Sequence, residues 1–370
     1  MFMIIECVLE KIKKAVIFAE QITGKNLSLP VLANIILEIK DRSLKIKSTN
    51  LDLGLEIYIP CKITNENNLS IALNGVLFNN FFNNLPTITD KIKIELLEKN
   101  LKISSPQHTT LIKSLPVDDF PIIPIPNKTN SFFIHSQELT KALKSVWLSA
   151  SFSTMKPEIS SVCFYQQPDN LVLVATDSFR LAEKIIKTGK NKLTINQLIV
   201  PLKNIVKIIK IIDLLDEDLE IKYDQHQISF NAKDFYLTSR LIDGVYPDYR
   251  QIISTHWETE IIVSRLELLN LLKLANVFTD KFNQVDFSFT VNKLEIKTLN
   301  ENGDNLVWLT PLTINGEPVA VSLNLKYLLD GLMAIESEQI TLKFNGGNKP
   351  IMVAGVGDNS FIYLIMPIRR

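Results

Sequence analysis

The hydrophobic and polar positions of this chain follow a pattern that recurs three times. A short apolar run, followed by a segment whose apolar residues have helical spacing, starts at Met3, Ser131 and Thr259, so the copies lie about 128 residues apart. Apolar residues at this spacing form one buried face of a helix. Each copy therefore predicts a strand followed by an amphipathic helix, and the recurrence predicts three similar domains.

Each copy continues with a second strand and helix and then with a pair of strands. The second strand and helix start at Ser70, Leu198 and Ala320, and the strand pairs start at Lys91, Leu219 and Ile340. In the first pair Ile92, Ile94 and Leu96 alternate with polar residues, as a sheet with one buried face requires. The predicted fold class is α+β, with three similar domains that each hold two helices and antiparallel sheets.

Two proline-rich segments, residues 116–127 and 243–252, mark the predicted domain boundaries. Proline lacks the backbone N–H that a sheet ladder needs, so such segments are typical of linkers. We expect an N-terminal domain over residues 1–125, a central domain over 126–250 and a C-terminal domain over 251–370.

Charge and composition narrow the classes of function. The 370 residues include 40 basic and 40 acidic side chains, and this zero net charge argues against a strongly basic nucleic-acid arm, an acidic tail or a polybasic membrane patch. The first two thirds carry a slight basic excess and the last third an acidic excess, which suits head-to-tail association. A hydrophobic content of 46% predicts a folded chain.

The cysteines and the apolar runs indicate the compartment. Cys7, Cys61 and Cys163 are odd in number and widely spaced, so they predict neither a disulfide framework nor a metal site. The first residues have their acidic and basic side chains in the wrong order for a signal peptide, and charged or polar residues interrupt every apolar run before it could span a membrane. We expect a cytoplasmic protein.

Catalytic chemistry finds little support in the sequence. There is no glycine-rich phosphate loop, metalloprotease helix motif or nucleophile elbow, and the four histidines lie in different segments without a partner at ligand spacing. An enzyme that uses Asp118, Asp119 or Asp177 stays an alternative, although adjacent acids and a turn-like ATDSFR segment are more typical of turn hydrogen bonding. We expect no catalytic residue, metal or cofactor.

Lysines on the predicted helices form the clearest polar pattern. Lys203, Lys207 and Lys210 lie at i, i+4 and i+7, on one stripe of a helix whose other face is apolar. Two further helices each carry a pair at i and i+3, namely Lys11 with Lys14 and Lys141 with Lys144. One such pair alone is an ordinary solvated face. Repeated over equivalent helices, the lysines predict a surface that follows a polyanion through phosphate contacts without reading bases.

The end of the chain, YLIMPIRR, is unusually apolar. Leu364, Met366 and Ile368 alternate along a predicted strand and share one face, and Pro367 suits that strand to a sheet edge. A patch of Met and aliphatic side chains is typical of a surface that accepts several peptides. The alternative is a buried terminal strand.

Six ordered motifs carry a resemblance to a known family. They are LPVLANIILE from Leu29, SLPVDDFP from Ser114, VATDSFRLAEK from Val174, YPDYRQI from Tyr246, SLNLKYLLDGL from Ser322, and the ending YLIMPIRR. Together with the threefold repeat, they resemble the bacterial sliding clamps, the beta subunits of DNA polymerase III. The resemblance implies the DNA clamp fold, a non-catalytic processivity factor of DNA replication, and two protomers that close head to tail into a ring around duplex DNA. A peptide-binding repeat scaffold that does not encircle DNA is the alternative function.

By this resemblance, Lys25, Asn26, Met155 and Lys156 join the helix lysines near the DNA. The family often has Arg where this chain has Asn26, so the resemblance implies a weaker contact there. The family's protomer interface maps onto Phe81, Leu85 and Ile112 in the first third and Val277 and Phe278 in the last third. These five apolar residues fit either an interface or internal core.

The resemblance also implies a hydrophobic groove for short linear motifs of the polymerase alpha subunit, the clamp loader delta subunit, other DNA polymerases and repair proteins. Carried over by motif, its residues are Ile159, Thr176, Ser178, Arg180, Leu181, Pro247, Ile252, Asn324, Tyr327, Leu364, Met366, Pro367 and Ile368. The apolar members supply burial, while Arg180 and Tyr327 orient a peptide. The family commonly has Gly-His where this chain has Ser178 and Phe179, and often Arg where it has Gln251, which implies a more apolar rim.

Overall fold

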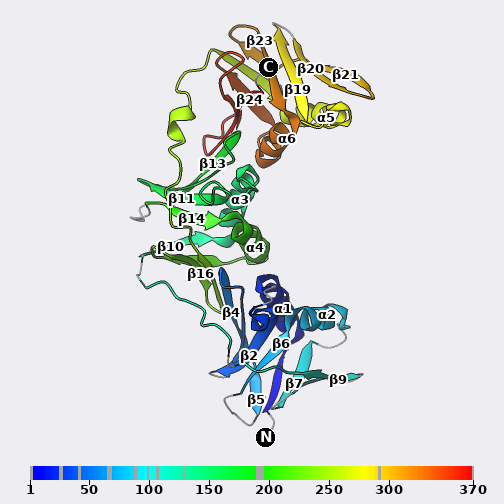
Figure 1. Cartoon of the computed structure of the whole chain (residues 1–370), viewed down its shortest axis with the longest axis vertical. Coiled ribbons are helices and arrows are strands. Elements are labelled where there is room, and N and C mark those ends of the chain that lie inside the picture. Colours follow the sequence, from blue (N-terminus) through cyan, green and yellow to red (C-terminus); the bar gives the residue numbers. More distant parts are fainter. Residues whose placement is uncertain are drawn as a thin grey trace. The chain divides into compact units, whose positions relative to one another are not determined.

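The computed structural model describes most of the chain in two compact units. The described residues are 3–24, 28–40, 43–64, 69–86, 90–97, 100–105, 108–117, 119–127, 130–188, 196–290 and 293–368. The first unit comprises residues 1–136 and 210–241, and the second comprises 137–209 and 242–370. Figure 1 labels the main elements along the chain.

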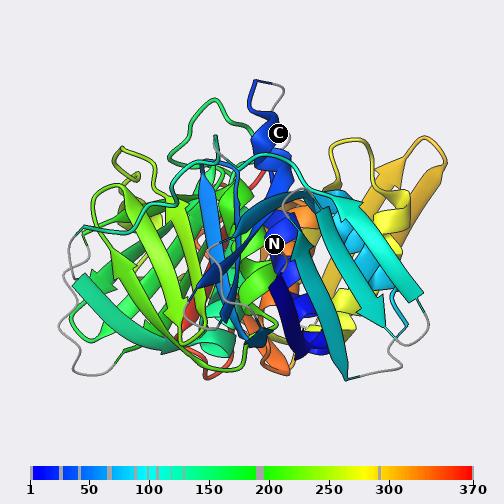
Figure 2. The same cartoon turned by 90° about the horizontal axis from the view of Figure 1, so that it is seen from below.

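The described residues of the first unit form sixteen elements. They are β1 (Met3–Val8), α1 (Leu9–Ile22), η1 (Pro30–Ala33), β2 (Asn34–Lys40), β3 (Ser43–Thr49), β4 (Leu53–Pro60), β5 (Lys62–Thr64), β6 (Ser70–Asn74), α2 (Gly75–Asn84), β7 (Lys91–Leu97), β8 (Asn100–Ser105), β9 (His108–Lys113), β10 (Asn130–His135), β15 (Asp218–Tyr223), β16 (Gln227–Ala232) and β17 (Phe235–Arg240). The labelled α1 and α2 pack side by side, and Figure 2 shows the blue α1 among the strands, of which it contacts β3 and β4.

The second unit contains most of the remaining elements. They are η2 (Trp147–Ser149), β11 (Ser161–Gln167), β12 (Asn170–Thr176), β13 (Arg180–Lys187), β14 (Leu198–Pro201), η3 (Arg250–Ile252), β18 (Thr259–Ser264), α5 (Arg265–Ala275), η4 (Asn276–Phe278), β19 (Gln284–Thr290), β20 (Lys293–Asn300), β21 (Gly303–Leu309), β22 (Thr313–Asn315), β23 (Val319–Asn324), α6 (Leu325–Ala334), β24 (Gln339–Phe344), β25 (Ile351–Gly355) and β26 (Phe361–Ile365). Two helices, α3 (Ser136–Val146) and α4 (Leu202–Ile212), include residues of both units.

These elements confirm the predicted threefold pattern. The first strand and helix of each copy are β1 with α1, β10 with α3, and β18 with α5. The second strand and helix are β6 with α2, β14 with α4, and β23 with α6. The strand pairs that follow are antiparallel hairpins, β7 with β8, β15 with β16, and β24 with β25. The α+β fold class, with three similar parts and antiparallel sheets, is therefore confirmed.

The sheets of each unit join residues from different thirds of the chain. The first unit has a five-stranded sheet, β5-β1-β7-β8-β9, and an eight-stranded sheet, β10-β15-β16-β17-β4-β3-β2-β6. The second has a nine-stranded sheet, β14-β11-β12-β13-β26-β25-β24-β18-β22, and a four-stranded sheet, β21-β20-β19-β23. Because β17 pairs with β4 and β13 pairs with β26, each large sheet crosses one predicted domain boundary.

The terminal strand differs from its prediction in one respect. The sequence predicts an edge strand, but β26 lies inside the nine-stranded sheet, between β13 and β25. Leu364 pairs with Leu181 on one side and with Met352 on the other, and its side chain is 2% exposed. The strand ends at Ile365, two residues before Pro367, so the missing proline donor interrupts no ladder.

Tight packing of α6 on β26 fixes one position in the second unit. Gly331 is buried, and a Cβ on it would lie 2.5 Å from two ring carbons of Tyr363.

Among the described helices, none is long and apolar enough to cross a membrane.

We expect Gly331→Ala to destabilise the protein by about 1–3 kcal/mol, because the added methyl group forces Tyr363 and β26 apart. In a helix, alanine is ordinarily more favourable than glycine by about 1 kcal/mol. The sign of the change in the free energy of unfolding therefore distinguishes the effect of packing from that of helix propensity. Urea unfolding of both variants measures it, with the exposed α5 change Asn270→Ala as the control. A stabilised Gly331→Ala protein would contradict this packing.

Candidate partner groove and nucleic-acid surface

A hydrogen-bonded turn between β12 and β13 forms the centre of the predicted groove. Thr176 Oγ1 donates to the carbonyl of Arg180 at 2.7 Å and accepts from the backbone N–H of Ser178 at 3.2 Å. Asp177 Oδ1 accepts from the N–H groups of Phe179 and Arg180 at 2.9 and 3.0 Å. The sequence interpretation of Asp177 as a turn residue is therefore confirmed.

Arg180 lies beneath this turn in a polar cluster. Its side chain is 5% exposed, Nε donates to Asp177 Oδ2 at 3.0 Å, and Nη1 donates to Asp330 Oδ2 at 2.5 Å. The guanidinium carbon lies 4.3 Å from the ring centroid of Tyr327, a cation–π geometry. Burial lowers the pKa of Arg180, but Tyr363 and the two carboxylates outweigh it and raise that pKa. The guanidinium already has two charged partners.

The end of the chain is tied to the same turn. The N–H of Met366 donates to the carbonyl of Phe179 at 2.8 Å, and the N–H of Ile368 donates to the carbonyl of Ser322 in β23 at 2.8 Å. The side chains of Met366, Pro367 and Ile368 are half-buried. These backbone bonds place the partly exposed apolar end beside the turn and β23.

Helix α6 and its N-cap residue supply further polar groups of this region. Asn324 caps the helix, because its Oδ1 accepts from the N–H of Tyr327 at 3.2 Å. The Asn324 amide also donates to the carbonyl of Phe282 at 3.1 Å, and the Tyr363 hydroxyl donates to the carbonyl of Tyr327 at 2.9 Å. Two of these bonds hold the backbone of Tyr327, whose half-buried ring packs on Arg180.

Apolar members of the predicted groove lie in and around one core cluster. Leu181 and Leu364 belong to a cluster that includes Tyr246 and Tyr249 from segment 243–252. The same segment carries the exposed Pro247 and Ile252, which is 44% exposed. Ile159 is buried just before β11, where its carbonyl accepts from the N–H of Ser151 at 2.8 Å. The role of these residues as a groove stays a prediction.

Sequence reasoning missed several residues that hold this region together. Asp330 pairs with Arg180, and Tyr363 supports Tyr327. Tyr327 and Asp330 stand three residues apart on α6, a spacing that places both on one helix face and could have indicated the partner. No local spacing connects Arg180 to Asp330, because 150 residues separate them.

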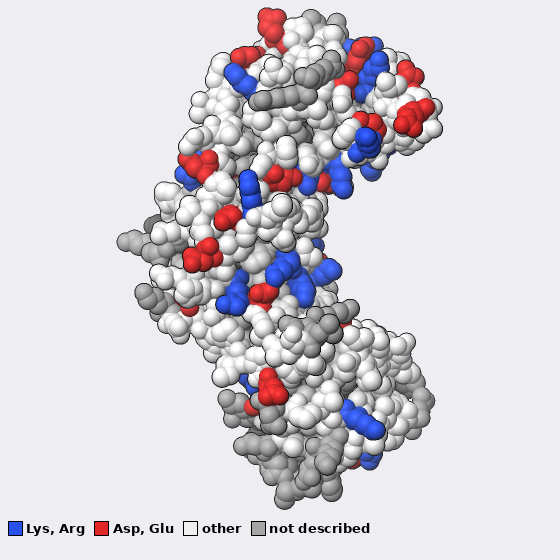
Figure 3. Space-filling view, in the orientation of Figure 1, with Lys and Arg blue, Asp and Glu red and all other residues white. Residues whose placement is uncertain are grey.

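The predicted DNA-contacting lysines lie in different surroundings. On α4, Lys203 and Lys210 are exposed and Lys207 is half-buried, while Ile205, Ile208 and Ile212 are fully buried on the other face. On α3, Lys141 and Lys144 are exposed, and Lys141 Nζ pairs with Glu336 at 2.6 Å. Figure 3 shows basic and acidic side chains interspersed on one face of the chain, so the positive charge is local.

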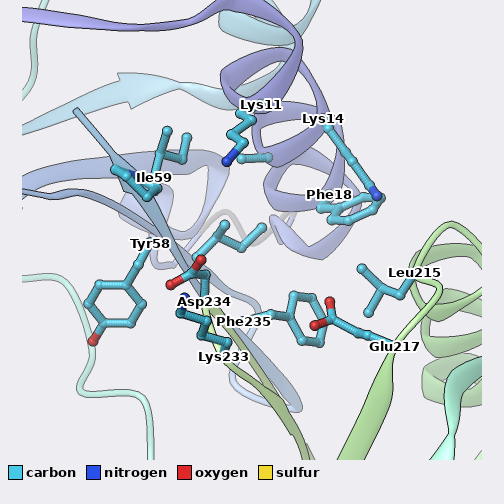
Figure 4. Close-up of a pocket in the computed structure, with 13 residues that line it drawn as sticks. Lys11, Lys14, Phe18, Tyr58, Ile59, Leu215, Glu217, Lys233, Asp234 and Phe235 are labelled. Atoms are coloured by element: carbon cyan, nitrogen blue, oxygen red, sulfur yellow. The ribbon is translucent and has the colours of Figure 1, made fainter.

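Lys11 and Lys14 line a pocket in the first unit. The pocket has a volume of about 280 Å³, and Figure 4 shows the side chains that surround it. Lys14 Nζ donates to the carbonyl of Leu214 at 2.6 Å and lies 5.6 Å from the ring centroid of Phe18. The other lining residues are Ala15, Phe18, Ile57, Tyr58, Ile59, Pro60, Leu215, Glu217, Lys233, Asp234 and Phe235. Because Glu217 and Asp234 accompany the lysines, the pocket is mixed in charge.

Two other predicted DNA contacts are strongly exposed, and two cannot be placed. Met155 is 90% exposed, and Lys156 is also exposed in the loop after η2. Lys25 and Asn26 lie outside the described residues. All of these contacts stay predictions.

The predicted interface residues differ in exposure. Phe81 is half-buried, with its ring centroid 5.4 Å from that of Phe82. Leu85 and Ile112 are only 9% and 7% exposed, whereas Val277 is 68% exposed and Phe278 is half-buried. Leu85 and Ile112 therefore contribute to the core of the first unit, and the interface role of the five residues stays a prediction.

The described residues bring together no group of side chains that supports the alternative of an enzyme. Within them, no group of three or more His, Cys, Asp or Glu side chains is placed to hold a metal ion. Asp118 lies outside the described residues, Asp119 is exposed, and Asp177 is paired with Arg180.

Ser178 adopts a left-handed backbone conformation, with φ of 78°. A side chain is unfavourable there and glycine is not, so we expect Ser178→Gly to stabilise the protein by about 1 kcal/mol. Chemical unfolding measures the effect. The matched change Ser131→Gly, at an exposed position of β10, should instead destabilise by about 0.5–1 kcal/mol. Equal losses in both variants would contradict the turn geometry.

Models of one protein family match nearly the whole chain. The DNA polymerase III beta subunit N-terminal domain matches residues 2–124, its central domain matches 133–248, and its C-terminal domain matches 250–369.

Similar sequences and structures agree with that match. The beta sliding clamp of Synechococcus elongatus is 28% identical over 353 residues, which cover 92% of each chain. That of Bacillus subtilis is 26% identical and covers 92% of this chain and 93% of the relative. Crystal structures of the DNA polymerase III beta subunit from Thermotoga maritima and the sliding clamp from Bacillus subtilis have TM-scores of 0.93 and 0.91. Both cover 100% of each chain, at 24% and 25% identity.

Proposed function

The chain belongs to the DNA polymerase III beta subunit family, and on that premise we propose that it is the sliding clamp of a bacterial DNA polymerase III. It acts as a non-catalytic subunit that holds the polymerase on its template during DNA replication. The observation that carries this proposal is the ordered match of all three family domains. The alternative scaffold that does not encircle DNA is not favoured by this membership.

The proposed working form is a cytoplasmic head-to-tail homodimer that encircles duplex DNA. Strands β9 and β21 each end a sheet, so each offers a backbone edge to another copy. The exposed Val277 and the half-buried Phe81 and Phe278 supply apolar area for such an interface. The proposed domains are residues 1–125, 126–250 and 251–370.

The proposed DNA contacts are weak and independent of sequence. The exposed lysines of α1, α3 and α4 suit phosphate oxygens, and a closed ring keeps the protein on DNA without tight binding. The ion pair between Lys141 and Glu336 weakens the positive charge that Lys141 offers to a phosphate.

The proposed groove in the second unit binds linear motifs of the polymerase alpha subunit, the clamp loader delta subunit, other DNA polymerases and repair proteins. Its support is the convergence of the chain end, the Thr176–Arg180 turn and Tyr327. Since Arg180 is paired with two carboxylates, it acts mainly as a fixed floor on which a peptide lies.

Topological retention tests the ring. We expect a solution mass twice that of the chain, and retention on circular DNA after loading but loss from the same DNA once linearised. Replacing Lys203, Lys207 and Lys210 with Glu should speed loss from linear DNA, whereas Lys62, Lys187 and Lys297, exposed on strands, serve as a matched charge control. Equal retention of the unmodified protein on both forms would refute encirclement.

Removal of the residues after Ile365 tests the groove. This truncation leaves β26 intact but removes the backbone bonds of Met366 and Ile368, so polymerase alpha subunit binding should fall at least tenfold. The dimer mass should stay the same. Surface plasmon resonance and light scattering measure the two quantities, and unchanged affinity would remove the groove assignment.

A further inference from the structure

A buried carboxylate lies in an apolar part of the second unit. Glu183, in β13, is 7% exposed and lies two residues from Leu181, so both side chains project from the same face of the sheet. That face carries the apolar cluster of Leu181, Val174 and Leu364. Burying a carboxylate is unfavourable in free energy unless hydrogen-bond donors surround it. The donors around Glu183 therefore indicate which segments it holds in place.

Two tyrosines provide these donors. The hydroxyl of Tyr165 donates to Glu183 Oε2 at 3.1 Å, and the hydroxyl of Tyr249 donates to the same oxygen. The Tyr165 hydroxyl also lies within hydrogen-bond distance of the Tyr249 hydroxyl, and because each phenol has one proton, the Tyr165 proton is shared between the carboxylate and that oxygen. The guanidinium of Arg250 lies 5.1 Å from the Tyr165 ring centroid and closes the cluster. Tyr165 lies on β11 and Glu183 on β13, two strands of one sheet with β12 between them, whereas Tyr249 comes from segment 243–252.

This segment carries two residues of the proposed groove, Pro247 and Ile252. It has no strand pairing, and Tyr249 lies directly before the short helix η3. A second attachment is at Tyr246, whose N–H donates to Gln197 Oε1 at 3.0 Å. Pro247 lies between Tyr246 and Tyr249, and Ile252 follows Tyr249 by three residues.

We propose that Glu183 positions the rim of the groove through Tyr249. The inference rests on the proposed groove and adds residues that touch no peptide themselves. A rim held in place before binding loses less conformational freedom when a peptide arrives, so the anchor increases affinity.

The equivalent strand of the first unit uses its carboxylate differently. Turn residues Thr49 and Thr176 make the same hydrogen bonds, which aligns Glu56 of β4 with Glu183. Glu56 pairs with Lys45 of its own sheet at 2.5 Å. The linker of that unit is held by Tyr236, whose hydroxyl donates to the carbonyl of Pro124 at 2.6 Å, and by the half-buried Asp224, whose Oδ2 accepts from the N–H of Asn127 at 2.9 Å. A buried carboxylate that holds a linker tyrosine therefore distinguishes the segment beside the proposed groove from this linker.

The test compares Tyr249→Phe with the control Tyr236→Phe, each in the full-length chain. Each change removes one phenol hydroxyl that holds a linker. We expect Tyr249→Phe to weaken binding of the polymerase alpha subunit about three- to tenfold, and Tyr236→Phe to leave it unchanged. Dimer mass and retention on circular DNA should stay the same in both. Unchanged binding in Tyr249→Phe, or an equal loss in both variants, would overturn the anchor.

Two further measurements separate positioning from general loosening. Glu183→Gln keeps an acceptor for the tyrosines and should retain most of the affinity, whereas Glu183→Leu should match Tyr249→Phe and add nothing to it in the double variant. Hydrogen exchange at residues 246–253 should quicken in Tyr249→Phe but not in Tyr236→Phe. If the unmodified protein does not bind the alpha subunit, the proposed function fails while hydrogen exchange still decides whether the anchor exists; unchanged exchange would overturn it.

Discussion

Strand pairing between consecutive thirds of the chain is the constraint on which the rest of each unit depends. β17 pairs with β4 in the first unit, and β13 pairs with β26 in the second. In each case a backbone bond extends the pairing into the turn: the N–H of Arg240 donates to the carbonyl of Asp52, and that of Met366 donates to the carbonyl of Phe179, both at 2.8 Å. Since continuous sheets span these junctions, each third is held to its neighbour by main-chain geometry, which tolerates changes of side chain.

The same backbone turn carries different chemistry at the two junctions. In the first unit Thr49 Oγ1 donates to the carbonyl of Leu53, and in the second Thr176 Oγ1 donates to that of Arg180, both at 2.7 Å. Leu53 is 1% exposed and belongs to the core, whereas Arg180 brings a charge that requires Asp177 and Asp330. The repeated turn therefore has the same backbone structure at both junctions. A few side chains at equivalent positions give the second junction its buried polar cluster.

Local patterns explain how much the sequence could predict. Each predicted strand, helix and hairpin depends on periodicity within about 20 residues, and the structure has them all in order. The position of β26 inside a sheet could not be read locally, because its partner β13 lies far away in sequence. The same limit applies to Asp330 beside Arg180 and to Glu183 beneath Tyr249, where each partner is chosen by the fold. For the candidate site, motif resemblance named the wall residues but not the groups that hold them.

The charged groups beneath the proposed groove contribute more to a single, well-defined conformation than to the free energy of unfolding. A buried ion pair gains little over an apolar replacement, because desolvation offsets most of the attraction. Losing one partner is costly, however, since it leaves a charge unpaired. Arg180 between two carboxylates, and Glu183 between two phenols, therefore make alternative arrangements unfavourable. A surface that receives many short motifs needs such rigidity, since each motif is too small to provide the free energy for ordering its own site.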